Sequence, residues 1–169
     1  TALMTWLLLD PFYNLLNEWS QIIYFVSAAS MVVGSLGAIM QTNFKRLLAY
    51  SSIGHIGFAL IGIVTVEYDG IRGVLMYLMI YLSMTIATFA CIISLRKGDN
   101  EFETLSDFSG LSKTHPRMAF AIAVLMLSMA GIPPLAGFFA KLYVLLPAVH
   151  QGMYGLAIIA VVASVIAAY

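Results

Sequence analysis

The chain has 169 residues, of which 62% are hydrophobic and 9% are charged, and its formal net charge is zero. Soluble proteins carry about 25% charged residues, so this composition excludes a soluble globular protein and predicts an integral membrane protein. No basic patch alternates with aromatic residues, which excludes nucleic-acid binding as a function.

Membrane-spanning helices are expected where about 20 successive residues are predominantly apolar. A partial span at Thr1 to Leu9 is closed by Asp10 and Pro11 and follows no initiator Met or positively charged leader, so we expect a piece of a longer subunit. Five full spans follow: Trp19 to Met40, Leu47 to Val66, Val74 to Leu95, Arg117 to Pro147 and Gly152 to Tyr169. The sequence therefore predicts an all-α, polytopic transmembrane helix bundle.

Basic residues predict the orientation of the spans. They gather in the loops after the first and third full spans, at Lys45, Arg46, Arg96, Lys97, Lys113 and Arg117. The opposite loops hold Arg72 as their one basic residue, so the positive-inside rule places the first group in the cytoplasm or matrix. Inside the full spans, the remaining charged residue is Lys141, and no Asp or Glu lies there.

Two further features concern the regions outside the spans and the redox chemistry. The connector KGDNEFETLSDFSGLSKTHPR (residues 97–117) shows no sustained apolar period, which favours a solvated connector over a docking segment for a neighbour. Cys91 is the single cysteine and leaves no pair for a disulfide or for cluster ligation. We therefore expect Cys91 to be a small buried residue and any redox chemistry to occur in a partner.

The fourth span is too long for one straight helix. Its roughly 30 residues would measure about 45 Å, whereas the hydrocarbon core is about 30 Å thick. Within it, GIPPLAG (residues 131–137) places Pro133 and Pro134 in tandem between two glycines that tolerate unusual dihedrals. Because proline lacks an N–H, the carbonyls of Met129 and Ala130 lose their helical donors. We predict an interruption near Gly131 to Pro134 rather than a mere kink.

Lys141 lies seven residues beyond Pro134, about two turns into the second half-helix. A charge at the bilayer centre costs about 2.5–3.5 kcal/mol on insertion scales, so an ionisable residue there indicates function. A lysine held out of bulk water can exchange a proton near neutral pH. It donates hydrogen bonds and accepts none, whereas Na⁺ or K⁺ needs oxygen ligands, so a proton is the expected ion. Snorkelling of the long side chain to the interface is the alternative, since Pro147 is six residues away.

Hydroxyl groups and a histidine on neighbouring spans could relay protons to this lysine. The spacing of four, four and three residues predicts one helical face for Tyr77, Tyr81, Thr85 and Thr88. The second span similarly groups Ser51, Ser52 and His55. Each residue taken alone is more often a packing or backbone-bonding group, and for His55 the structural and proton-handling interpretations both remain open.

Three segments together resemble one family. They are QTNFKRLLAYSSIGHIGFALIG (residues 41–62), DFSGLSKTHP (residues 107–116) and LSMAGIPPLAGFFAKLYVL (residues 127–145). In this order and spacing they resemble the antiporter-like subunits of respiratory complex I, the proton-pumping NADH:quinone oxidoreductase. Among these, the resemblance favours the subunit N group, called NADH dehydrogenase subunit 2 in mitochondria, because the third span carries tyrosines and no histidine.

The resemblance implies a fold with two inverted five-helix repeats. Residues 1–18 would supply the end of a preceding helix and an outer loop, and residues 19–169 one five-helix half-channel repeat. Lys141 would be the protonatable lysine of the half-channel, with His55, Tyr77 and Tyr81 as proton-transfer candidates and Pro133 and Pro134 at the helix break.

The resemblance also implies partners and a location. This chain would hold no cofactor or metal, while NADH, FMN, iron–sulfur clusters and quinone would bind to partner subunits. Partners would be other complex I membrane subunits, including antiporter-like ones, and the N-terminal part of the same subunit, in a mitochondrial or bacterial inner membrane. Two alternatives are a subunit of an Mrp-type cation/proton antiporter without a redox partner, and a structural membrane subunit in which Lys141 snorkels.

Overall fold

The computed structural model describes Phe12, residues 15–95 and residues 104–168, and the regular elements within them are helices. Three of these helices are long and apolar enough to cross a membrane: α2 (Leu16–Ile39), α3 (Phe44–Val64) and α4 (Tyr68–Ser94). Three shorter apolar helices follow: α6 (Pro116–Ala130), α7 (Ala136–His150) and α8 (Tyr154–Ala168). The predicted all-α bundle is thus confirmed, while the expected partial span at Thr1 to Leu9 lies outside the described residues.

Helices α4 and α7 extend beyond the apolar spans predicted for them. Helix α4 begins at Tyr68 rather than Val74, because Glu67 precedes it in an extended conformation and Asp69 places a negative charge in its first turn, where the helix dipole favours one. Helix α7 continues through Pro147 to His150. The carbonyl of Tyr143, which Pro147 cannot bind, is covered by Gly73 of α4, where an added Cβ would lie 2.6 Å from that oxygen.

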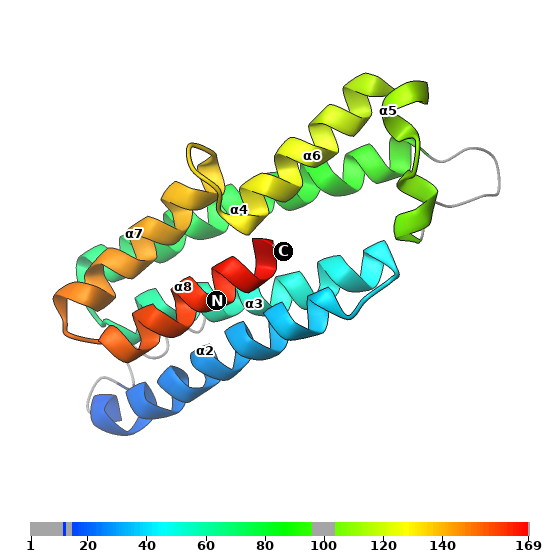
Figure 1. Ribbon diagram of the computed structural model, residues 1–169. Helices are drawn as coiled ribbons and strands as arrows, with labels where there is room; N and C mark the ends of the chain where they lie inside the picture. The colour runs from blue at the N-terminus through cyan, green and yellow to red at the C-terminus, as the bar shows by residue number, and fades with distance from the viewer. Residues whose placement is uncertain (1–11, 13–14, 96–103, 169) are drawn as a thin grey trace.

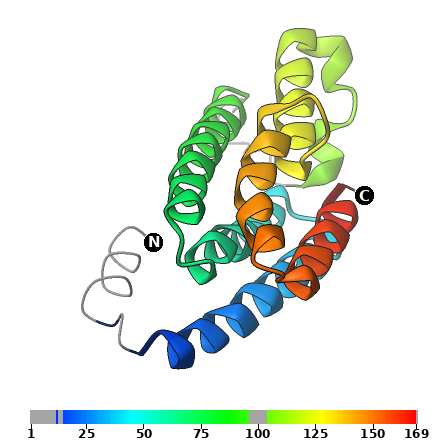
Figure 2. The ribbon, with the colours of Figure 1, turned by 90° about the vertical axis from the view of Figure 1, so that its left-hand side faces the viewer.

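Helix α3 occupies the centre of the bundle. Of the residues in its apolar spanning stretch, 56% are buried, compared with 28% for α2 and 22% for α4. Helices α2 and α4 therefore lie at the periphery of this unit. Helices α6 and α7 follow one another along α4, and α8 lies against α2 and α3 (Figures 1 and 2). Many large apolar side chains face outwards, Phe25, Met79 and Val165 among them, as expected for a surface in contact with lipid or other membrane subunits.

The loops are sorted between the two ends of the bundle as the basic residues predicted. The turn between α2 and α3 and the connector segments η2 (Leu105–Phe108) and α5 (Leu111–Thr114) lie at one end, and the α3–α4 and α7–α8 turns at the other (Figure 1). The α2–α3 turn is joined to η2 by a hydrogen bond, in which the Leu105 N–H donates to the Thr42 carbonyl at 3.0 Å. At the other end, the Gln151 side chain donates to the Thr65 carbonyl. Which end faces the cytoplasm or matrix stays a prediction.

The described part of the connector is folded rather than simply solvated. Leu111 is buried, and the Phe108 ring lies 4.7 Å from that of Phe44 at the start of α3. Most other side chains of η2 and α5 are exposed, so this segment covers the end of α3 with a few apolar residues. A docking role for it stays a prediction.

Glycines bring α2 and α3 into close contact. A Cβ on Gly34 would collide with the backbone of Gly54, and one on Gly57 would lie 2.8 Å from the Met31 side chain. Ser27 of α2 donates a 2.7 Å hydrogen bond to the Gly57 carbonyl across the same contact. We call this contact, at Gly34, Gly54 and Gly57, the glycine seam. Small residues of this kind allow helix backbones to approach within a membrane.

Candidate functional site

The predicted interruption of the fourth span is confirmed. Helix α6 ends at Ala130, and Gly131 follows in the left-handed conformation with φ of 91°. The Ile132 N–H donates to the Leu127 carbonyl at 3.2 Å and the Gly131 N–H to the Ser128 carbonyl at 3.0 Å, the pattern of a Schellman motif. Helix α7 begins five residues further on, after the two prolines.

The side chain of Lys141 extends from α7 to the end of α6. Its side chain is only 6% exposed, and its Nζ donates to the Ala130 carbonyl at 2.7 Å and to Ser164 Oγ of α8 at 3.2 Å. The ammonium also lies 4.8 Å from the centroid of the Phe58 ring, within the range of a cation–π contact. The Ala130 oxygen is one of the carbonyls that the tandem prolines were predicted to free, so the break itself supplies an acceptor for the lysine.

A second hydrogen bond crosses the break, and here α6 supplies the side chain and α7 the backbone group. The residue before α7, Leu135, has no side chain that can cap the helix. Instead, Ser128 of α6 accepts from the Gly137 N–H at 3.1 Å and donates to Met84 Sδ of α4 at 3.0 Å. Each half-helix therefore caps the other, and we call the group formed by Ser128, Ala130, Gly137 and Lys141 the cross-capped break.

The role predicted for Gly137 needs correction. Its φ is not positive, unlike that of Gly131, so it supplies no unusual dihedral. An added Cβ on Gly137 would instead collide with the Ser128 carbonyl. Gly137 is required because the start of α7 lies directly against the last turn of α6.

The geometry does not support snorkelling of Lys141. Its ammonium bonds within the bundle, at the C-terminal end of α6, rather than extending to the far end of α7. The carbonyl end of a helix carries partial negative charge and favours a cation. Lys141 is the sixth residue of α7, beyond the first turn, where the opposing positive end of that helix has its effect.

His55 of α3 forms the second part of the site. It is 7% exposed, and its Nδ1 lies 2.6 Å from the hydroxyl of Tyr77 of α4, which is itself buried. The ring of Tyr81 stacks on the imidazole with centroids 4.6 Å apart. The structure thus brings together His55, Tyr77 and Tyr81, with a hydrogen bond to the first tyrosine and a ring contact to the second.

The rest of the predicted hydroxyl face is bonded to the backbone. Thr85 and Thr88 each donate at 2.8 Å to the carbonyl four residues earlier in α4. Ser52 likewise donates within its own helix, to the Ala49 carbonyl at 2.6 Å. For these three residues the backbone-bonding interpretation describes the structure. Tyr77 differs from them, because its hydroxyl bonds to the candidate proton-transfer residue His55.

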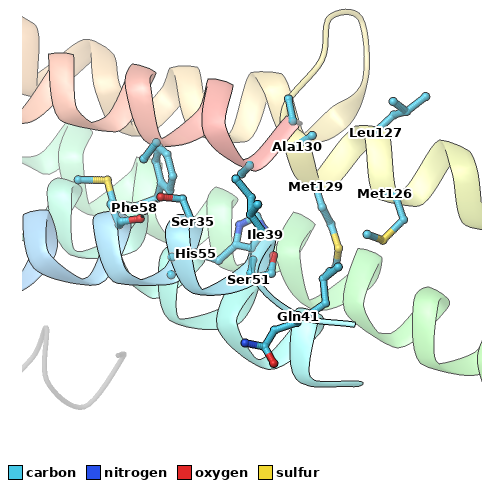
Figure 3. Close-up of a pocket in the computed structure, with 18 of the residues that line it drawn as sticks. Ser35, Ile39, Gln41, Ser51, His55, Phe58, Met126, Leu127, Met129 and Ala130 are labelled. Carbon is cyan, nitrogen blue, oxygen red and sulfur yellow. Dashed lines mark hydrogen bonds between the residues drawn. The ribbon is translucent and has the colours of Figure 1, made fainter. Parts of the chain in front are cut away.

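A cavity of about 360 Å³ joins the lysine and the histidine. Both side chains line it, together with Ser51 and Phe58 of α3 and Ala130 at the end of α6. Figure 3 shows Ser51 and His55 projecting from α3, and Met129 and Ala130 from α6. Lys141 and His55 therefore line one shared cavity, and the break forms part of its wall.

Sequence reasoning missed three residues that contact the site. Phe58, Ser128 and Ser164 all bond or pack against the break or its lysine. Ser164 could have been noticed as the one Ser or Thr in α8, but its partner depends on how the helices pack. Within the described part of the chain, no group of three or more His, Cys, Asp or Glu could hold a metal ion, and Cys91 is a free, partly buried thiol.

Comparison with known families gives one match over residues 1–167, to the transmembrane family described as NADH:quinone oxidoreductase/Mrp antiporter. The chain is 53% identical over 161 residues to NADH-quinone oxidoreductase subunit N of Methylobacterium nodulans, covering 95% of this chain and 33% of the relative. It is 51% identical over 168 residues to subunit N of Paramagnetospirillum magneticum, covering 99% and 34%. The chain thus spans about a third of the length of these relatives.

The chain also matches solved structures of respiratory membrane complexes. A chain of respiratory complex I from Thermus thermophilus with bound aureothin matches with a TM-score of 0.77 and 36% identity, over 88% of this chain and 34% of that one. A chain of the membrane-bound sulfane sulfur reductase, an archaeal respiratory membrane complex, matches with a TM-score of 0.81 over 90% and 31%. At 23% identity the second likeness shows a shared fold alone.

Proposed function

The chain belongs to the NADH:quinone oxidoreductase/Mrp antiporter transmembrane family, and from that premise we propose that it forms a proton half-channel of a respiratory NADH:quinone oxidoreductase. The observation that carries the proposal is the buried ammonium of Lys141, held by the Ala130 carbonyl at an interruption of its own span. A lysine in this position can exchange a proton, because small movements of two half-helices change what its ammonium touches.

The polar side chains around the cavity favour a proton over a metal cation. Lys141 has donors and no acceptor, and its positive charge would repel Na⁺ or K⁺ from the same space. His55 and Tyr77 can each donate and accept a hydrogen bond, so a proton can pass between them across their 2.6 Å contact without a bound ion. In this proposal Tyr77 and His55 exchange protons with Lys141 through the shared cavity, and Tyr81 holds the imidazole in place.

The proposal assigns the oxidation chemistry to other chains. NADH, FMN, iron–sulfur clusters and quinone would bind to partner subunits of the complex in a bacterial or mitochondrial inner membrane. Electron transfer there would alter the conformation of the membrane subunits and the protonation of Lys141, while Pro133 and Pro134 keep the two half-helices separate. The partners would include other antiporter-like subunits and the remaining, N-terminal part of this subunit.

Substitution of Lys141 in the complete complex tests the proposal. Lys141→Met keeps most of the side-chain volume and removes the ammonium. We expect NADH-driven proton pumping in inverted membrane vesicles, and the coupled quinone reduction, to fall by at least about a hundredfold, the lower end of the range for losing a proton-transfer group. The matched control is Lys113→Met, which changes an exposed lysine of α5 and should leave both activities unchanged.

Two results would reject the proposal in different ways. Normal pumping by an assembled Lys141→Met complex would indicate a structural subunit. Exchange of Na⁺ for protons in reconstituted vesicles without NADH or quinone would instead favour the Mrp-type antiporter, which the family also includes. Content of assembled complex is measured in parallel, so that a failure to assemble is not mistaken for a loss of proton transfer.

A further inference from the structure

Ser164 places one hydroxyl beside the ammonium on an otherwise apolar face. Its Oγ lies 3.2 Å from Lys141 Nζ, 23 residues away in sequence. Helix α8 contributes alanines to the same cavity, at positions 163, 167 and 168. The contact therefore comes from the one Ser or Thr that this helix carries.

The hydrogen bond of Ser164 differs from those of most other hydroxyls in the helices. Five of these donate to the carbonyl four residues earlier in their own helix: Ser35, Ser83, Thr85, Thr88 and Ser94. Such bonds are the common way for a membrane helix to satisfy a hydroxyl, and they say nothing about function. Ser164 instead accepts from a cation of a different helix.

A hydroxyl suits a group that changes its protonation state. The charged form of a lysine has three N–H donors and no acceptor, whereas the neutral amine has two N–H donors and one lone pair. By rotating its O–H, a serine can accept from the ammonium and then donate to the amine. The Ala130 carbonyl, the other partner of Lys141, can only accept.

We propose that Ser164 is a positioning residue for proton transfer, whose hydroxyl stays bonded to the Lys141 nitrogen before and after the proton leaves. The inference rests on the proposed function and adds to it a residue of α8. By this role, Ser164 keeps the nitrogen beside the end of α6 when the charge that attracted it there is gone.

Two variants of equal shape test the role of the hydroxyl in the complete complex. Thr and Val side chains have nearly the same volume, but only Ser164→Thr retains the oxygen. We expect Ser164→Thr to pump protons at close to the wild-type rate and Ser164→Val to pump about tenfold more slowly, the scale of losing a hydrogen bond to a charged group. Equal pumping by the two variants would overturn the inference.

Controls separate this inference from the proposed function. Ser83→Val removes an exposed, backbone-bonded hydroxyl of α4 and should have no effect. In a Lys141→Met background, Ser164→Val should cause no further loss, because the group it positions is absent. A loss of pumping by Lys141→Met alone, with equal rates for the Thr and Val variants, would leave the half-channel standing and remove Ser164 from it.

If the added methyl groups prevent assembly of both variants, Ser164→Ala replaces them. It removes the hydroxyl without adding volume, and we expect the same slower pumping relative to the wild type. Wild-type pumping by Ser164→Ala would then overturn the inference.

Discussion

The glycine seam and the cross-capped break hold pairs of helices together by different means. At the seam, α2 and α3 are continuous helices, and the contact depends on the absence of side chains at Gly34 and Gly57. At the break, helical backbone bonds are missing, and the side chains of Ser128 and Lys141 replace them across the gap.

This difference indicates where the molecule can change its state. Close-packed backbones have one good arrangement, and separating them loses many small contacts at once. Hydrogen bonds between side chains and free backbone groups can be exchanged for similar bonds at little net cost. We therefore expect the seam to act as a fixed support and the break to be the region that responds to protonation.

The largest expected effect lies in the seam, where two glycines face each other with unequal space. A Cβ on Gly34 would collide with the backbone of Gly54, whereas a Cβ on Gly54 would lie 3.9 Å from the Gly34 Cα, an ordinary contact. Gly34→Ala should therefore destabilise the chain by about 1–3 kcal/mol, the usual range for overpacking, and Gly54→Ala should be tolerated. The amount of assembled complex and its thermal midpoint measure the difference. Equal stability of the two variants would mean that the seam is not the rigid contact described.

An intermediate effect is expected at the break, where Gly131 can be compared with Gly110. Both have positive φ, 91° and 79°, so an alanine costs about 1–2 kcal/mol of backbone strain at either position. A Cβ on Gly131 would also lie 3.0 Å from Lys141 Nζ, whereas one on Gly110 would meet nothing within 4 Å. We expect both variants to lose similar stability, while only Gly131→Ala also loses pumping per assembled complex. Similar pumping by the two would show that the position of the ammonium tolerates disturbance.

The sequence was sufficient to predict features that depend only on residues close together along the chain. The tandem prolines predict the free Ala130 carbonyl, because a missing N–H acts on the carbonyl four residues back whatever the tertiary fold. The spacing of Tyr77 and Tyr81 places them on one face of α4, and both indeed contact His55. The isolated charge of Lys141 in an apolar span likewise identifies it as a candidate functional residue, without knowledge of its neighbours in space.

Partners from other helices could not be predicted in the same way. In a chain where nearly every span is apolar on all sides, the hydrophobic pattern does not say which face meets which helix. Ser164, Phe58 and Ser128 are ordinary residues in such spans until packing places them beside Lys141 or Gly137. The function of Gly137 was misjudged for the same reason, since its neighbour is the backbone of another helix rather than its own turn.

The smallest expected effect concerns α3, which carries the seam and the candidate relay on neighbouring residues. His55 lies between Gly54 and Gly57 in sequence, so the rigid contact also fixes the imidazole. If the region that responds to protonation extends from the break to α3, loss of the Tyr77 hydroxyl should slow proton pumping. Loss of the Tyr81 hydroxyl should not, because Tyr81 contacts His55 through its ring and makes no hydrogen bond to it. We expect Tyr77→Phe to slow proton pumping about threefold, the scale of one neutral hydrogen bond, and Tyr81→Phe to leave it unchanged because the stacked ring remains. Measurement of both rates per assembled complex decides the point. Equal rates would confine proton exchange to Lys141 and its partners at the break, and would make His55 part of the fixed support formed by the seam.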